Sequence, residues 1–141
     1  MKVFLDTSSL FKLYHKEEGT DELIGLFSEN QIERIFLAEI TKIEFDSVVW
    51  KKYRKRELVE DTALKLIRAF EKDWPKYTFV SDDNELRSNA KHLISKHGAE
   101  GLRTLDSLQL ASAIQAKLET NRYFTSDKLL ASIFKKENLP L

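Results

Sequence analysis

The sequence predicts an α/β fold, with a mainly parallel sheet of four to five strands covered by helices on both faces. Short apolar runs alternate with longer helical segments, and two of these runs end in an Asp at a strand-to-helix junction. This alternation is typical of parallel sheets, whose strands are buried on both sides. The 141 residues contain only four Gly and two Pro and show no linker or repeat, so we expect one domain over residues 1–141.

Four segments fit buried strands, because each is a short run of mainly β-branched, aliphatic or aromatic residues: Val3–Leu5, Ile35–Ala38, Tyr77–Val80 and Arg122–Thr125. The last residues, Leu139–Leu141, leave room for no more than a stub of a fifth strand. The pattern predicts the fold class but not the order of the strands in the sheet.

Helices are expected in the intervals between these strands. Residues with side-chain oxygens, such as Thr20, Asp83 and Thr104, suit the N-cap position, where they can accept hydrogen bonds from free backbone N–H groups. The expected helices are Leu10–Tyr14, Thr20 to about Phe27, Ile40–Arg56, Val59–Lys72, Asn84–Lys96, Leu105–Lys117 and a last one from Asp127.

The overall composition excludes several classes of function. Lys plus Arg (23) balance Asp plus Glu (23), so only a local patch could attract nucleic acid. The absence of cysteine excludes zinc–thiolate sites and thiol nucleophiles. No stretch approaches the roughly 20 apolar residues that span a bilayer, so we expect a cytoplasmic protein without membrane contact. His15, His92 and His97 share no metal-ligand spacing and have no nearby acid, and we interpret them as ordinary surface or packing residues.

Asp6 and Asp127 occupy similar positions, since each follows a strand and precedes a helix. Ligands of open α/β sheets gather beyond the carboxyl ends of the strands, where these two residues are expected. Asp is also a common N-cap, and either residue taken alone could be only a cap. The functional interpretation depends on further carboxylates reaching the same edge.

Glu44 and Asp106 are the further candidates. Glu44 has Ile40, Ile43 and Val48 as helical neighbours, which predicts a carboxylate on an inward-facing apolar stripe. Asp106 lies in the first turn of the most apolar helix of the chain. A buried salt bridge for Glu44 and a favourable helix dipole for Asp106 are the structural alternatives.

Four carboxylates in one pocket repel one another unless a cation neutralises them. Hard divalent cations prefer oxygen ligands, and magnesium typically takes one or two carboxylates together with waters and phosphate oxygens. Such a pocket suits metal-assisted hydrolysis of phosphodiesters, in which the metal activates a water and stabilises charge on the phosphate.

The sequence resembles the PIN-domain ribonucleases, and among them the VapC-like toxins of prokaryotic type II toxin–antitoxin systems. The resemblance covers nearly the whole chain. Each matching motif is weakly specific, but four of them follow in the family's order: Val3–Leu10, Ala38–Glu44, Leu102–Ala113 and Phe124–Asp127.

The resemblance implies a Rossmann-like α/β/α sandwich and an endoribonuclease that depends on Mg²⁺, with Mn²⁺ as a substitute. It implies metal ligands at Asp6, Glu44, Asp106 and Asp127, with Asp6 and Asp106 the principal ones. The hydroxyls of Ser8 and Thr125 match supporting positions. A cognate antitoxin that blocks the groove and a homodimer are the implied partners besides RNA.

A basic cluster follows Glu44 on the same predicted helix and, with Tyr53 available for stacking, could bind an RNA backbone. A solvated helix end, where cations complement the dipole, is the alternative. A further cation beside the predicted site could contact phosphate or pair with an acid. The candidate RNA-binding residues are Lys51, Lys52, Arg54, Lys55, Arg56 and Arg103.

Three other functions compete with the toxin. Aspartyl-phosphate phosphatases also open with a strand followed by Asp, but Ser8 stands where their second Asp is usual. A housekeeping RNA-processing nuclease is the runner-up within the same chemistry. A PIN-like module that binds RNA or protein without catalysis is the third, and the presence of all four acids speaks against it.

Overall fold

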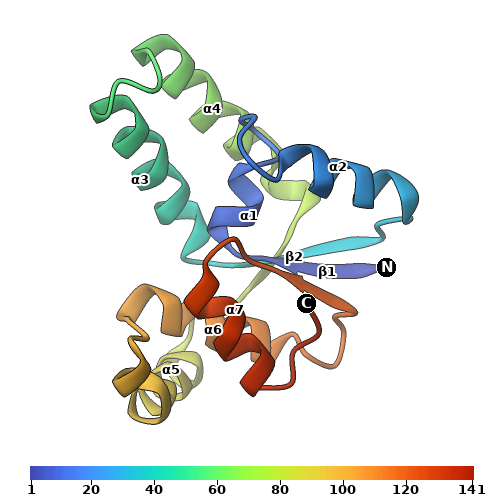
Figure 1. Ribbon diagram of the computed structural model, residues 1–141, viewed down its shortest axis with the longest axis vertical. Coiled ribbons are helices and arrows are strands. Elements are labelled where there is room, and N and C mark those ends of the chain that lie inside the picture. The colour runs from blue at the N-terminus through green and yellow to red at the C-terminus, as the bar shows by residue number, and fades with distance from the viewer.

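The computed structural model describes all 141 residues and contains one sheet of four parallel strands in the order β3-β2-β1-β4 (Figure 1). Each strand falls within one of the four predicted segments or extends it by one residue: β1 Lys2–Leu5, β2 Arg34–Ala38, β3 Thr78–Val80 and β4 Arg122–Phe124. The fold class is therefore confirmed. β1 lies between β2 and β4, so the residue that follows it stands near the middle of the sheet edge.

Seven helices and two short 3₁₀ turns connect the strands. The helices lie close to the predicted ranges and differ from them by a few residues at their ends. Asp83 is an N-cap as predicted, but Thr20 and Thr104 are the first helical residues after the N-caps Gly19 and Arg103. They are α1 Thr7–Phe11, α2 Thr20–Glu29, α3 Thr41–Arg54, α4 Glu60–Asp73, α5 Asn84–His97, α6 Thr104–Gln115 and α7 Lys128–Lys136, with 3₁₀ turns η1 Trp74–Lys76 and η2 Gly98–Glu100.

The sheet separates two helical layers and two apolar cores. In Figure 1, α1 to α4 lie on one side of the strands and α5 to α7 on the other. Successive strand residues point to opposite faces. Val3 and Leu5 accordingly belong to the core under α1, α3 and α4, whereas Phe4 belongs to the core under α5, α6 and α7. All three side chains are fully buried, which explains the continuous apolar run at the start of the chain.

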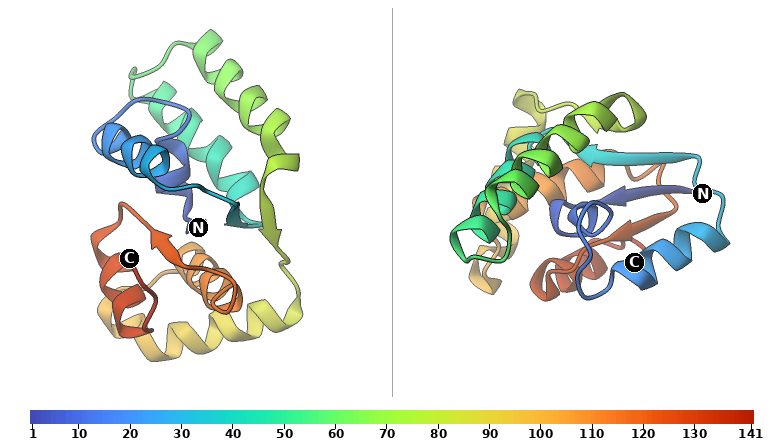
Figure 2. Two further views of the ribbon diagram at one scale, coloured as in Figure 1. Left: turned by 90° about the vertical axis from the view of Figure 1, so that its right-hand side faces the viewer. Right: turned by 90° about the horizontal axis from the view of Figure 1, so that it is seen from above.

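Helices α3 and α4 form an antiparallel hairpin that extends away from the sheet (Figure 2). Its inner face is held by aromatic packing, in which the rings of Phe45 and Phe70 lie 4.4 Å apart between centroids. The start of α3 adjoins the sheet edge, and its basic end lies out along the hairpin (Figure 1). The helix therefore connects the sheet edge to the basic cluster.

The C-terminal residues do not form a fifth strand. One backbone hydrogen bond joins them to the sheet, from the N–H of Tyr123 to the carbonyl oxygen of Pro140 at 2.7 Å. Proline has no N–H with which to continue a strand ladder, so the pairing stops there. The sheet therefore has the lower of the two expected strand numbers.

Two further expectations, one about membrane-spanning helices and one about histidine, can be compared with the structure. No helix combines the length and apolarity needed to cross a bilayer. His97 is buried packing, as expected, but it does have an acid partner: its Nε2 lies 2.8 Å from Oε1 of Glu137, a residue remote in sequence.

Candidate active site

The site forms where the carboxyl ends of β1 and β4 meet. The two strands are paired through Leu5 and Phe124, and the N–H of Asp6 donates to the carbonyl oxygen of Phe124 at 3.1 Å. Two residues further on, the N–H of Ser126 donates to Oγ of Ser8 at 3.0 Å. The two similar strand-to-helix junctions are thus neighbours, as the sequence predicted.

Asp6 is held by donors from both junctions. Its Oδ1 accepts hydrogen bonds from the Ser9 N–H at 2.9 Å and the Ser8 hydroxyl at 2.7 Å, and its Oδ2 accepts one from the Thr125 hydroxyl. Asp6 is therefore the N-cap of α1, and the hydroxyls of Ser8 and Thr125 both donate to it. With only 4% of Asp6 exposed, burial raises the pKa of its carboxyl despite these hydrogen bonds.

Glu44 lies near Asp6, at the start of α3. Its Oε1 accepts hydrogen bonds from the Gln109 amide at 2.7 Å and the Thr7 hydroxyl at 3.1 Å. No Lys or Arg pairs with it, so the buried salt bridge considered above does not form. Burial raises the pKa of Glu44, and the negative charges of Asp6 and Asp106 add to this effect.

The predicted apolar surroundings of Glu44 are partly wrong. The fully buried seam of α3 is one position away, at Thr41, Phe45 and Val49. Ile43, expected to face inward, is 73% exposed. Glu44 lies at the border between this buried seam and solvent. Its carboxylate can therefore face an open groove while the rest of the side chain is packed.

Asp106 and Asp127 are the other two predicted carboxylates, and they accept fewer hydrogen bonds from the protein than Asp6 and Glu44 do. Asp106, in the first turn of α6 as predicted, accepts no hydrogen bond. Burial raises the pKa of Asp106, as does the nearby charge of Asp127, while Arg103 opposes the rise. Asp127 is exposed, and its Oδ1 caps α7 by accepting from the Leu130 N–H at 2.8 Å.

All four carboxylates line one groove of about 370 Å³, which we call the carboxylate groove. They share it without forming a tight cluster, because no three acidic or imidazole side chains are close enough to enclose a metal ion. The groove is mostly polar and extends along α3. Its lining residues are Asp6, Thr7, Ser8, Phe11, Glu17, Glu44, Val48, Lys51, Lys52, Lys55, Glu57, Asp106, Gln109 and Asp127.

The structure divides the six candidate RNA-binding cations. Lys51, Lys52 and Lys55 line the carboxylate groove, whereas Arg54 and Arg56 line a separate hollow on the α3–α4 hairpin. Arg103 stands outside the groove as the exposed N-cap residue of α6. Only part of the cluster therefore faces the carboxylates.

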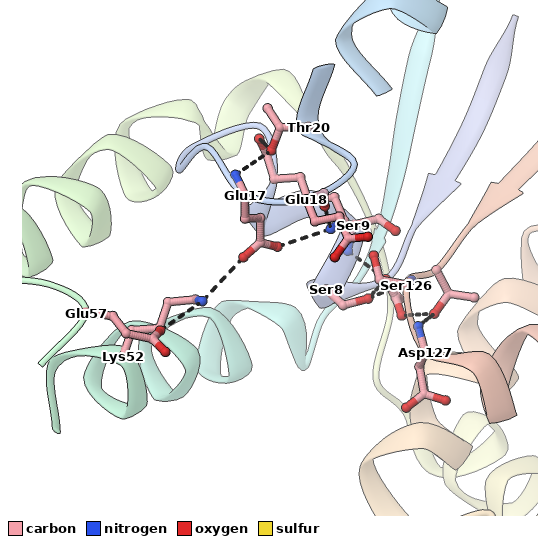
Figure 3. Close-up of polar contacts among 12 residues, drawn as sticks. Ser8, Ser9, Glu17, Glu18, Thr20, Lys52, Glu57, Ser126 and Asp127 are labelled. Carbon is pink, nitrogen blue, oxygen red and sulfur yellow. Dashed lines mark hydrogen bonds and ion pairs between the residues drawn. The ribbon is translucent and has the colours of Figure 1, made fainter. Parts of the chain in front are cut away.

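Lys52 differs from Lys51 and Lys55 because its ammonium group already forms ion pairs within the protein. Its Nζ lies 3.3 Å from a Glu17 carboxylate oxygen and 3.4 Å from one of Glu57, as Figure 3 shows. It also lies over the ring of Phe11, 5.3 Å from the centroid. Lys51 and Lys55 are exposed and make no ion pair with the chain, so they are the cations of the groove free to bind phosphate.

Three uncharged residues of the site were not predicted. Thr7, Thr41 and Gln109 are all buried; Thr7 and Gln109 donate to one oxygen of Glu44, and Thr41 is bonded to both of them. A sequence signal existed for Gln109, since it lies one helical turn after Asp106 and is polar among apolar neighbours. The partners it meets are 65 to 102 residues away and left no local pattern.

Comparison with known proteins gives the family. The family model described as PIN domain matches residues 3–135. The chain belongs to the PIN-domain family. No curated protein matches the sequence. PIN membership places the chain outside the aspartyl-phosphate phosphatases.

Two solved structures share the fold at low sequence identity. The structure of VapC20 from Mycobacterium tuberculosis, described as a Sarcin-Ricin loop cleaving toxin, has a TM-score of 0.67 and 14% identity, with 93% of this chain and 94% of that chain covered. VapBC2 from Rickettsia felis, bound to a DNA fragment from their promoter, has a TM-score of 0.60 and 15% identity, covering 99% and 94%. At this identity the likeness concerns the fold.

Proposed function

We propose that this PIN domain is a Mg²⁺-dependent endoribonuclease and the toxin of a toxin–antitoxin pair. The observation that carries the proposal is the convergence of Asp6, Glu44, Asp106 and Asp127 on one groove. Family membership and the toxin described for VapC20 support RNA as the substrate. The complete acid set favours catalysis over a binding module without activity.

The donor set of the groove fits a hard divalent cation. Three of its carboxyls have a raised pKa, so their charges gain from neutralisation by an ion. The ligands available are all oxygens, and magnesium needs only one or two carboxylates when waters and phosphate complete its shell. Asp6 and Asp106 would be the principal ligands, with Glu44 and Asp127 beside them. Bound there, the ion would supply positive charge at the phosphate and a more acidic water.

The side chains of the groove would orient the RNA by charge. An α-helix rises about 1.5 Å per residue, which puts Lys51 and Lys55 about 10 and 16 Å along α3 from Glu44. Carboxylates repel phosphate unless a cation lies between them, whereas free lysines attract it. We therefore infer that the scissile phosphate binds among the acids and that flanking phosphates follow α3 towards its basic end.

An antitoxin and a second copy of the chain are the proposed protein partners. The likeness to VapBC2 supports an antitoxin, and the family resemblance supports a homodimer. Coexpression with the product of the adjacent open reading frame tests the first. Light scattering of the purified chain tests the second.

Cleavage of RNA by the purified protein tests the activity. We expect endonucleolytic products with Mg²⁺ or Mn²⁺, none with EDTA, and at least a hundredfold slower cleavage by Asp6→Asn or Asp106→Asn. Asp61→Asn, at an exposed position on α4, serves as the matched control and should retain full activity. Cleavage that persists in EDTA or in both groove variants would contradict the proposal.

The housekeeping nuclease is distinguished in cells. Induction of the chain alone should arrest growth, and the neighbouring reading frame should relieve the arrest if the chain is a toxin. Asp106→Asn should not arrest growth. Normal growth with an active, well-expressed protein would favour the housekeeping role.

A further inference from the structure

Gln109 is the buried polar side chain that joins three segments of the site. Its Nε2 lies 3.0 Å from the Thr7 hydroxyl of α1, and 2.9 Å and 2.7 Å from Thr41 Oγ1 and Glu44 Oε1 of α3. Gln109 itself comes from α6 and is only 3% exposed. The amide thus links the two layers of helices at the edge of the sheet.

The carboxylate of Glu44 fixes the orientation of this amide. If the amide were flipped, its oxygen would lie beside Glu44 Oε1, and two acceptors would face each other without a hydrogen. In the observed orientation the NH₂ group faces the acceptors, but the amide oxygen is buried with no partner. An unsatisfied buried acceptor costs about 1–3 kcal/mol. An apolar side chain of the same size would remove this cost, but it would also take a hydrogen-bond donor away from Glu44 and Thr41.

The consequence for Glu44 is that one of its oxygens is anchored and the other is not. Oε1 accepts from both Gln109 and Thr7, while Oε2 has no hydrogen-bond partner in the protein. Thr41 makes no hydrogen bond to Glu44 but is bonded to Gln109, so it supports the amide. The arrangement holds a carboxylate with one oxygen directed for a ligand.

We propose that Gln109 is a positioning residue, which holds the Glu44 carboxylate in the orientation the groove needs and is itself held by Thr41. Where RNA cleavage is the measured quantity, this positioning role rests on the proposed function, because both concern the carboxylate groove. It predicts a substitution whose effect on metal affinity and activity depends on the presence of Glu44.

Gln109→Met tests this role, since Met has a similar length and no polar group. We expect a folded variant whose melting temperature lies within a few degrees of the wild type, because the lost donor to Glu44 opposes the gain from removing the unsatisfied amide oxygen. We expect Mn²⁺ affinity, measured by electron paramagnetic resonance, and kcat for RNA each to fall about 10- to 100-fold, with KM unchanged. Ser112→Ala is the matched control, because Ser112 is buried on the same helix but bonds only to the Leu108 carbonyl. It should leave affinity and kcat unaltered.

A coupling measurement separates positioning from a structural role. In a Glu44→Ala background no carboxylate remains to be positioned, so Gln109→Met should leave the remaining Mn²⁺ affinity within twofold. Equal losses in the two backgrounds would overturn the proposal, as would wild-type affinity and kcat in Gln109→Met. If Gln109→Met does not fold, Thr41→Val removes the support of the amide with an isosteric side chain. A loss of affinity only when Glu44 is present would support the proposal, and no loss would overturn it.

The failure of this inference and that of the proposed function can be told apart. A chain whose Mn²⁺ affinity depends on Gln109 but which cleaves no RNA would refute the nuclease and leave the positioning role in place. A chain that cleaves RNA with full kcat after Gln109→Met would refute only the positioning role. A wild-type chain that binds no Mn²⁺ would refute both.

Discussion

Asp106 is the carboxylate of the groove that receives no hydrogen bond from the protein. Asp6, Glu44 and Asp127 each accept at least one, and these bonds offset part of the cost of holding a charge there. The charge of Asp106 meets only the nearby acids and, more weakly, Arg103. A protein that keeps such a carboxylate without partners sacrifices stability for a charge it uses in another way.

Asp106→Asn should therefore raise the melting temperature of the metal-free protein by a few degrees, because it removes repulsion and breaks no hydrogen bond. Millimolar Mn²⁺ should stabilise the wild type more than the variant, since binding to the folded state adds to stability. Differential scanning calorimetry with and without Mn²⁺ measures both effects. A variant less stable than the wild type without metal would show that Asp106 has a structural role.

Single residues could be placed from the sequence where the local pattern of strand, Asp and helix was sufficient. Asp6 and Asp127 each follow a strand and cap a helix, so their place at the sheet edge follows from a short segment. The contacts of Gln109 could not be predicted in this way, because Thr7 and Glu44 approach it only after the sheet has formed. The exposure of Ile43 depends on which face of α3 packs inward. The buried side chains of Phe45 and Val49 define that face.

At the scale of elements, α3 carries one face that begins acidic and ends basic. Glu44, Val48, Lys51 and Lys55 all line the groove, at spacings of four, three and four residues along the helix. Arg54 and Arg56 belong to the same basic cluster of the sequence, but they line the separate hollow on the α3–α4 hairpin. The sequence predicted the cluster, and the helical register decides which of its members reach the groove.

Replacing Lys51 and Lys55 together by Ala should weaken RNA binding for all sequences alike. The slope of log Kd against log salt should fall by about 0.7 for each lysine that contacts a phosphate. Arg54→Ala is the matched control and should change neither affinity nor slope. Fluorescence anisotropy with a catalytically inactive chain over a salt series makes the comparison. An Arg54→Ala effect equal to that of the double variant would place the RNA elsewhere.

Glu137, just after α7, ties that helix to α5. Its Oε1 accepts from Lys96 Nζ and His97 Nε2, each at 2.8 Å. Burial alone would raise the pKa of Glu137, but these two hydrogen bonds outweigh burial and lower it. A lowered folded pKa means that the contact adds stability above the unfolded value and loses it as the pH falls through the folded value.

Glu137→Gln should accordingly reduce the free energy of unfolding by about 1–3 kcal/mol at pH 7. The difference from the wild type should shrink as the pH falls below about 4.3, the usual Glu value, towards the lower folded pKa. Urea denaturation at several pH values measures it. Glu119→Gln, which loses only an exposed pair with Arg34, should cost less than 1 kcal/mol and serves as the control. A difference independent of pH would assign the effect to packing.

At the scale of the whole molecule, the parallel sheet is what converts distant segments into one site. Residues 6, 44, 106 and 127 are separated by up to 121 positions, yet β1 and β4 are neighbours and α3 and α6 start at the same edge. The alternation of strands and helices predicted this layout because both faces of the sheet need cover. The alternation alone does not give the strand order β3-β2-β1-β4, although the edge strands β3 and β4 contain fewer buried residues than β1 and β2.

The account depends most on a divalent cation binding between Asp6, which follows β1, and Asp106 of α6. Crystals soaked in Mn²⁺ and measured at an anomalous wavelength test this directly. We predict one strong peak in the carboxylate groove, at about 2.1 Å from oxygens of Asp6 and Asp106, which disappears in Asp106→Asn. A fully occupied peak elsewhere with none in the groove would contradict the account.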